Sequence, residues 1–388
     1  MIVRLHSAVM DGLDVRPVAV DVDVRVGLPS FTVVRARDST NHAVHQRLRS
    51  AIESQGYRVP QRRITVNVAP SSIRERVPAL DLPIALGVLA ASEQIPIDGL
   101  DRILTLGGLT PGGGLAHVRG AFPIAETTAQ DDRAILLPAD QRREVSAVRG
   151  LQVLEARTLK GAARALATPS PAPVSKSSVG RTTGTAPAME NVRGHVRSKA
   201  ELTAAVAAGK SPLLVGPTGA GKTALARSVG SLLPPMTDAE QRTVTRIHSA
   251  AGLHDCDGLI VDRPFRVPHH GTSEPGLLGS IERPGEVTLA HHGVDYLDDV
   301  TAIRPGLIGA VHKVLRDRAV TVYGKSWVRR MPADAVLIGG TTGCLCGHAF
   351  TSLCGCTPQD HDRYARKIDA VRGLFDTEIL VLPEPPTT

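Results

Sequence analysis

Aromatic residues are scarce in this chain of 388 residues, with five phenylalanines, four tyrosines and one tryptophan. A surface that stacks nucleic-acid bases on aromatic rings is therefore not expected. No apolar run reaches the length of about 18 residues that a membrane-spanning helix needs. Residues 1–6 also lack the apolar core of a signal peptide. We therefore expect a cytoplasmic protein without a membrane partner.

The chain carries a moderate excess of positive charge, with a formal net charge of +7 and a pI near 9.4. This balance permits an acidic partner such as DNA. The alternative is a set of basic residues scattered over solvated faces. If DNA binds, we expect contacts from the basic residues near position 320, which are Arg316, Arg318, Lys325, Arg329 and Arg330.

A stretch rich in proline, serine, threonine and glycine divides the chain. Residues 168–189 show no apolar periodicity and are typical of a linker. The parts on either side, 1–167 and 190–388, both have the length of an ordinary domain. The sequence therefore predicts two domains joined by a linker.

Apolar periodicity predicts a mixed α/β or α+β first domain. Valine recurs at every second position from 18 to 26, which indicates a half-buried strand. Val44, Leu48 and Ile52 recur at every fourth position, as on one face of a helix. Further strands are expected at 63–68 and 103–106 and a helix at 82–91. In the second domain, apolar runs at 213–215, 294–297 and 336–338 predict parallel strands of a three-layer α/β core.

Residues 216–223 match the phosphate-binding pattern G-x-x-x-x-G-K-[ST] in full. They are Gly216, Pro217, Thr218, Gly219, Ala220, Gly221, Lys222 and Thr223. An apolar run precedes them and a helix-compatible run follows, which is the context that this motif needs. Lys222 would reach the β- and γ-phosphates, and the Thr223 hydroxyl would bind Mg²⁺. The motif predicts ATP and Mg²⁺ as cofactors; the alternative is a glycine-rich turn that carries a lysine.

Acidic residues follow the second apolar run of this domain. A nucleotide hydrolase needs carboxylates at the end of a second strand to hold Mg²⁺ and polarise water. Asp298 would act on the metal, and Asp299 occupies the position of a catalytic carboxylate. Asp295, inside the strand, is unusual for a buried position. The alternative is a surface turn with three aspartates.

Four of the five cysteines form two C-x-C pairs separated by seven residues. They are Cys344, Cys346, Cys354 and Cys356. Four thiolates this close in sequence could form a tetrahedral Zn²⁺ site, with His348 or His361 as substitutes. The alternative is free thiols in a loop. Cys256 stands alone, and we expect it to be buried rather than reactive.

Several motifs occur in an order that resembles the magnesium-chelatase-like AAA+ proteins of the ComM/YifB type. Besides the phosphate loop they are residues 263–270, 284–287, 289–294 and 344–347, preceded by 27–34, 63–70 and 81–86. The resemblance covers nearly the whole chain. It implies a Lon-protease-like (ribosomal S5 domain 2-like) α+β domain followed by a P-loop AAA+ α/β domain. The stretch 80–83, which reads Leu-Asp-Leu-Pro, lacks the serine and lysine of active Lon, so no peptidase is expected.

The chain departs from the family pattern at several catalytic positions. Asp299 stands where the family has glutamate, Thr342 where it has a sensor asparagine, and Leu374 where it has an arginine. The family continues into a helical lid, whereas this chain ends at Thr388. An arginine supplied to a transferring phosphate is worth about 10³–10⁵ in rate in related nucleotidases. These departures predict ATP binding with weakened hydrolysis.

Three functions compete at this point. The first is an active, ring-forming AAA+ ATPase that acts on DNA, as the resemblance to ComM suggests for branch migration in recombination of incoming DNA. The second is a nucleotide-binding, hydrolysis-poor paralogue that acts as a regulatory or assembly subunit in a homo- or hetero-oligomeric ring. The third is an accessory ATPase of metal chelation, which the linked Lon-like domain disfavours.

Overall fold

The computed structural model describes residues 1–34, 38–70, 79–170, 172–173, 187–254, 256–280, 282–323 and 328–383. The chain divides into two compact units. Unit 1 comprises Met1–Gly180 and His248–Leu259, and unit 2 comprises Arg181–Ile247 and Ile260–Thr388. A short segment of the later sequence thus belongs to the first unit. Five residues of the expected linker, 168–170 and 172–173, lie in the described part of unit 1, and β10 (Ala172–Pro173) is among them.

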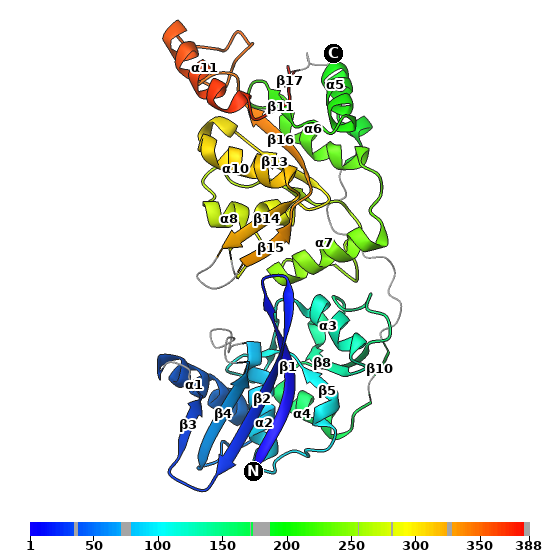
Figure 1. Cartoon of the computed structure of the whole chain (residues 1–388), viewed down its shortest axis with the longest axis vertical. Helices are drawn as coiled ribbons and strands as arrows, with labels where there is room; N and C mark the ends of the chain where they lie inside the picture. Colours follow the sequence, from blue (N-terminus) through cyan, green and yellow to red (C-terminus); the bar gives the residue numbers. More distant parts are fainter. Residues whose placement is uncertain are drawn as a thin grey trace. The chain divides into compact units, whose positions relative to one another are not determined.

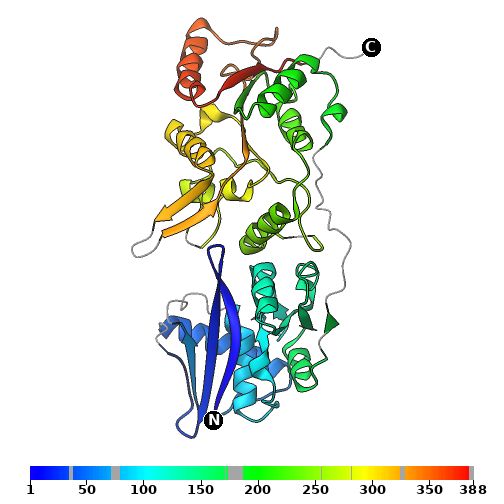
Figure 2. The same cartoon turned by 45° about the vertical axis from the view of Figure 1, so that its right-hand side comes forward.

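Unit 1 is built on an eight-stranded mixed sheet in the order β10-β9-β8-β5-β1-β2-β4-β3. Its long antiparallel hairpin of β1 and β2 is the dark blue ribbon pair in Figure 2. The strands are β1 (Ile2–Asp11), β2 (Asp14–Arg25), β3 (Ser30–Val33), β4 (Arg63–Ala69), β5 (Ile103–Thr105), β8 (Ala134–Pro138), β9 (Gln152–Ala156) and β10 (Ala172–Pro173). A small separate pair is β6 (Gly108–Leu109) with β7 (Leu115–Ala116).

Helices cover both faces of this sheet. They are α1 (Asp38–Ser54), α2 (Asp81–Ala91), α3 (Ala121–Gln130) and α4 (Leu159–Ala167), with short 3₁₀ turns at Leu100–Arg102 and Ala139–Gln141. Leu136 of β8 packs in one core with α1, α2 and α4, whereas its neighbours Ile135 and Leu137 pack in another with α3. Because successive strand residues point to opposite faces, one strand supplies both cores.

The expected elements of this unit are present. Val18, Val20, Val22 and Val24 of β2 are buried, and so are Val44, Leu48 and Ile52 on one face of α1. Val26, the last valine of the expected alternation, lies beyond β2 and is exposed. The strands expected at 63–68 and 103–106 are β4 and β5, and the helix expected at 82–91 is α2. Alternation therefore located β2, and four-residue spacing located α1, because each pattern reports which face is buried.

Asp81, in the stretch 80–83 that lacks the serine and lysine of active Lon, begins α2. Its side chain is buried and accepts hydrogen bonds from Nε and Nη2 of Arg47 on α1, at 2.5 and 2.8 Å. Burial raises the pKa of Asp81, while the bonds from Arg47 act in the opposite direction. The carboxylate thus joins α1 to α2, and a paired buried charge of this kind is costly to break.

Unit 2 contains a five-stranded parallel sheet in the order β12-β13-β16-β11-β17 (Figure 1). Its strands are β12 (Phe265–Arg266), β13 (Val294–Leu297), β16 (Val336–Thr341), β11 (Pro212–Val215) and β17 (Thr377–Leu380). The three apolar runs expected as parallel strands are β11, β13 and β16. An antiparallel hairpin, β14 (Ala319–Tyr323) with β15 (Val328–Pro332), stands apart from the sheet.

Helices flank the sheet of unit 2, with α5 and α6 on one side and α10 on the other (Figure 1). The helices are α5 (Val196–Ala207), α6 (Lys222–Ser228), α7 (Asp238–Ala251), α8 (Glu274–Leu278), α9 (Glu286–Leu289), α10 (Pro305–Arg316) and α11 (Pro358–Arg372). The last residues of α7, from His248 on, belong to unit 1. Short 3₁₀ turns lie at Met189–Asn191, Val229–Leu232 and Val300–Ala302. Leu214 and Tyr296 pack in the core that α5 and α6 share. This parallel α/β arrangement places the ends of β11, β13 and β16 at a common edge.

Candidate nucleotide-binding site

The phosphate loop, residues 216–223, joins the carboxyl end of β11 to the start of α6. Gly219 and Gly221 have left-handed backbones, with φ of +79° and +89°. Gly216 lies so close to Val381 that an added Cβ would be 1.9 Å from its carbonyl oxygen. Side chains other than hydrogen are strained or excluded at all three positions. The backbone therefore explains these three glycines of the motif one by one.

Lys222 is the first residue of α6, and its side chain is buried. Its Nζ donates hydrogen bonds to the carbonyl oxygens of Gly216 and Pro217, at 2.7 and 2.8 Å. Burial lowers the pKa of Lys222, and the negative charges of Asp298 and Asp299 act in the opposite direction. The ammonium group is thus held inside the loop by neutral acceptors that an anionic phosphate can replace.

The two candidate ligands of Mg²⁺ meet at one hydroxyl group. Tyr296, buried in β13, donates from its hydroxyl to Oδ1 of Asp298 at 3.0 Å. Burial raises the pKa of Tyr296, and a hydrogen bond with the side chain of Thr223 opposes that shift. Asp298 is exposed, directly after the carboxyl end of β13. The structure thus brings the side chains of Thr223 and Asp298 to the same hydroxyl group, that of Tyr296.

Asp299 is held by its neighbours in a different way. Its backbone is left-handed, with φ of +48°, and its N–H donates to Oδ1 of Asp298 at 3.1 Å. Its own Oδ1 accepts a hydrogen bond from the Thr301 hydroxyl at 2.7 Å. The carboxylate that would polarise water is therefore both shorter than glutamate and engaged within its own turn.

Two other departures from the family pattern lie in different places. Thr342 follows β16 and donates from its hydroxyl to the carbonyl oxygen of Cys344 at 2.9 Å. Leu374 lies just before β17, which runs parallel to β11 with Thr377 opposite Pro212. Leu374 therefore lies at the amino end of the strands, opposite the phosphate loop. The sequence analysis placed Leu374 in the same catalytic site as the phosphate loop and Asp299. Within one chain, the fold places Leu374 at the opposite end of the sheet from these residues.

Asp295 is fully buried in β13, and neither of its carboxylate oxygens has a hydrogen-bond partner among the described residues. Arg266 lies beside it on β12, but its guanidinium binds Glu286 through two hydrogen bonds of 2.7 and 3.0 Å. Burial and the charge of Glu286 raise the pKa of Asp295 to about 7, with Arg266 acting in the opposite direction. The neutral acid is the form that this position favours.

We expect an Asp295→Asn variant to gain stability relative to the parent as pH rises from about 4 to 7. Because folding raises this pKa from 3.8, the protonated acid stabilises the folded state at low pH and that contribution is lost as pH approaches 7. The difference should reach the order of 4 kcal/mol, at about 1.4 kcal/mol per pKa unit. Urea unfolding at several pH values measures it. Asp317→Asn, at an exposed position, is the control, and a pH-independent difference would contradict the expectation.

The four cysteines expected to group do so in the loop between β16 and α11. The cysteine cluster consists of the side chains of Cys344, Cys346, Cys354 and Cys356, whose sulfurs all lie within 4.8 Å of one another. Cys344 is buried, Cys346 is exposed, and the other two are half-buried. Cys256, expected to be buried, is half-buried instead, with its sulfur 3.7 Å from Nε2 of His254.

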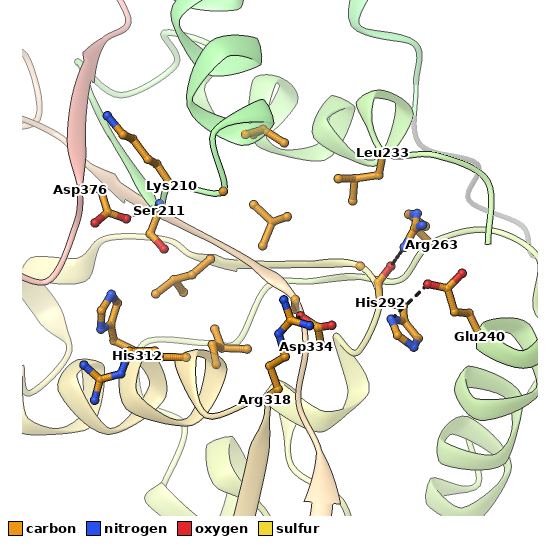
Figure 3. Close-up of a pocket in the computed structure, with 18 residues that line it drawn as sticks. Lys210, Ser211, Leu233, Glu240, Arg263, His292, His312, Arg318, Asp334 and Asp376 are labelled. Atoms are coloured by element: carbon orange, nitrogen blue, oxygen red, sulfur yellow. Dashed lines mark hydrogen bonds and ion pairs between the residues drawn. The ribbon is translucent and has the colours of Figure 1, made fainter. Parts of the chain in front are cut away.

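A cavity of about 540 Å³ lies at the amino ends of β11, β13 and β16. Figure 3 shows His292 and Glu240 facing each other at its edge, where their side chains are 3.7 Å apart. Arg318 and Asp334 form an ion pair there, at 3.7 Å. Since the phosphate loop follows the carboxyl end of β11, this cavity is separate from the candidate nucleotide site.

The basic residues expected to contact DNA fall into two groups. Arg316 and Arg318 line the cavity at the end of α10, and Arg329 and Arg330 lie on β15 of the adjoining hairpin. Arg316, Arg318 and Arg330 are exposed. Lys325 falls outside the described residues. The hairpin thus brings Arg329 and Arg330 together on one strand.

Comparison with protein families identifies the chain. Residues 188–382 match the family described as magnesium chelatase, subunit ChlI, and residues 20–141 match the family described as subunit ChlI of Mg-chelatase. The chain therefore belongs to the magnesium chelatase ChlI family, and the match over residues 188–382 covers the whole phosphate-loop sheet. In the described part of the chain no helix is long and apolar enough to cross a membrane.

Individual relatives are similar over nearly the whole chain. The uncharacterized protein YifB of Escherichia coli is 30% identical over 98% of this chain and 76% of its own length. The competence protein ComM of Haemophilus influenzae is 28% identical over 98% of this chain and 77% of its own length. An uncharacterized protein of Mycobacterium bovis is 31% identical over 94% of this chain and 74% of its own length. The expected resemblance to the ComM/YifB type is confirmed.

Proposed function

We propose that this chain is an ATP-binding AAA+ protein with weakened ATP hydrolysis. The observation that carries the proposal is the geometry of residues 216–223, which follow a parallel strand, open a helix, and require glycine at three positions. The family match supports it, since it spans this sheet and its loops. The expected Lon-protease-like fold of residues 1–167, without peptidase activity, is part of the same proposal.

The residues present suit ATP with Mg²⁺. Lys222 would exchange its two carbonyl acceptors for phosphate oxygens, and the backbone N–H groups at the start of α6 would face the same anion. Thr223 and Asp298, already linked through Tyr296, would hold the metal ion. Bound Mg²⁺ neutralises phosphate charge. Zn²⁺, the second metal ion expected from the sequence, would be held by the cysteine cluster.

Two features support weakened hydrolysis. Asp299 binds Thr301 and lacks the reach of glutamate, so a water molecule aligned for attack would have no well-placed base. Leu374 supplies no charge, and an arginine at that end of the sheet could act only on the nucleotide of a neighbouring subunit. In an oligomer of the kind that AAA+ proteins form, Leu374 would therefore contribute no charge to hydrolysis at the nucleotide of the neighbouring subunit.

An active ring ATPase that acts on DNA is the second candidate, since the name of the relative ComM refers to competence. A steady-state ATPase assay with and without DNA separates the two. Turnover below about one per minute in both conditions would agree with our proposal, since typical enzymes reach about 10 per second. DNA-stimulated turnover of several per second would favour the ring motor.

If DNA binds, we expect its affinity to fall steeply with salt, because the contacts are charge pairs with phosphates. Replacing Arg316 and Arg318 together by alanine should reduce the slope of log affinity against log salt concentration by about two, since about one unit is lost for each phosphate contact removed. Mobility shifts at several salt concentrations measure this, with Arg197→Ala on α5 as the matched control. Absence of a shift at low salt, or an unchanged slope in the double variant, would contradict this expectation.

A further inference from the structure

The cysteine cluster has the dimensions of a single-metal site. Tetrahedral zinc with Zn–S bonds of about 2.3 Å requires sulfurs about 3.8 Å apart. The sulfur of Cys344 lies 3.3 Å from that of Cys346 and 3.9 Å from that of Cys354, and the sulfurs of Cys346 and Cys354 are 3.7 Å apart. Cys356 completes the set within 4.8 Å of every other sulfur. The thiols therefore stand near the corners of one tetrahedron.

The ligand set indicates which ion fits. It contains four sulfurs, and soft thiolates favour zinc or iron over Mg²⁺ or Ca²⁺. Nε2 of His361 lies 3.8 Å from the sulfur of Cys354, but His361 is not one of the four grouped residues. A closed set of four protein ligands is typical of structural zinc, because no position stays open for substrate.

The same loop contacts the phosphate loop directly. The Gly347 carbonyl oxygen, between the two cysteine pairs in sequence, accepts a hydrogen bond of 2.7 Å from the Thr218 N–H. Gly347 has a left-handed backbone, with φ of +79°, and a Cβ there would lie 2.8 Å from Oγ1 of Thr218. The Gly216 N–H donates to the carbonyl oxygen of Thr341, at the end of β16, at 3.1 Å. Two bonds thus join the phosphate loop to β16 and the loop that follows it.

Residues 342–357 contain turns but no helix or strand, so few backbone bonds hold them. Ordering such a segment costs conformational entropy, which a metal bound by four side chains can offset. We propose that the cysteine cluster binds one Zn²⁺, and that this ion holds Gly347 against the phosphate loop and thereby strengthens nucleotide binding. The second half of this inference rests on the proposed ATP-binding function.

Metal analysis of the full-length protein, purified without chelators, tests the site itself. We expect about one zinc per chain, and loss of that zinc in Cys346→Ser, whose exposed position spares the core. Cys256→Ser, the same change outside the cluster, should keep it. Metal-free parent protein, iron in place of zinc, or full zinc in Cys346→Ser would each overturn the site.

Calorimetric titration with ADP tests the coupling. Removal of zinc with a chelator that spares Mg²⁺ should weaken ADP binding about fivefold, as expected for one lost hydrogen bond, and added Zn²⁺ should restore it. Gly347→Ala should weaken ADP binding similarly while keeping its zinc, because the clash falls on Thr218 and not on the thiols.

The outcomes distinguish this inference from the function on which it rests. A zinc-loaded protein whose ADP affinity does not change on zinc removal would overturn the coupling and leave both sites standing. A zinc-loaded protein that binds neither ADP nor ATP would overturn the proposed function, while its metal content would still establish the zinc site.

Discussion

Replacing Lys222 by alanine is expected to weaken ADP and ATP binding about tenfold to a hundredfold. The ammonium group is the cation of the phosphate loop, and a hydrogen bond to a charged group contributes about 1.5–3 kcal/mol. In the structure this group donates hydrogen bonds to the carbonyl oxygens of Gly216 and Pro217. Its removal leaves those acceptors without a donor but creates no unpaired charge. Isothermal titration calorimetry measures the affinity directly.

Lys210→Ala is the matched control for this experiment. Lys210 is an exposed lysine just before β11, at the end of the strand opposite the phosphate loop. Its loss should leave nucleotide affinity unchanged, and circular dichroism shows whether both variants fold. Equal affinities of the parent and Lys222→Ala would remove the basis of the proposed function.

The sequence predicted those elements whose pattern reports burial. The alternating valines of β2 and the spaced apolar residues of α1 face one core, so periodicity alone located them. The phosphate loop was predictable for a related reason. Its glycines occupy positions where the backbone has a positive φ or lies too close to another segment for a side chain. Both features depend on residues that are neighbours in the sequence, so they can be predicted from a single sequence.

Features that depend on contacts between distant segments could not be predicted in this way. Residues 248–259 join unit 1, where the hydroxyl of Ser249 donates to Glu144 at 2.5 Å and accepts from the Phe122 N–H at 3.2 Å. The bond between Thr218 and Gly347 likewise joins positions far apart in sequence. Nothing in the residue types of either segment indicates its partner, since backbone groups make part of each contact.

Leu374 shows how a motif can be matched and still misplaced. Alignment with the family pattern puts it among catalytic positions, and only the parallel pairing of β17 with β11 reveals that it lies at the amino ends of the strands. Its Cδ2 atom would lie 3.9 Å from a Cβ added to Gly309 of α10, which is an ordinary van der Waals distance. Arg372, two residues earlier, binds Glu378 and Asp369, so it does not substitute for the missing charge.

The double variant Asp299→Glu with Leu374→Arg is expected to hydrolyse ATP faster than either single variant. Glutamate would extend the carboxylate beyond the turn that Thr301 holds, and would act in its own subunit. An arginine at position 374 would act across a subunit contact, where such a residue is worth about 10³–10⁵ in rate. The two groups stabilise one transition state, so their effects should exceed the sum of the single changes.

Protein concentration provides the readout that identifies this mechanism. Because the added arginine needs a neighbouring subunit, the rate per chain of the double variant should rise with concentration, whereas that of Asp299→Glu alone should not. Steady-state ATPase assays over a wide concentration range measure both, with Asp299→Glu, Leu374→Gln as the control that adds a polar group without charge. A parent protein that already hydrolyses ATP at several per second would show that Asp299 and Leu374 do not limit catalysis.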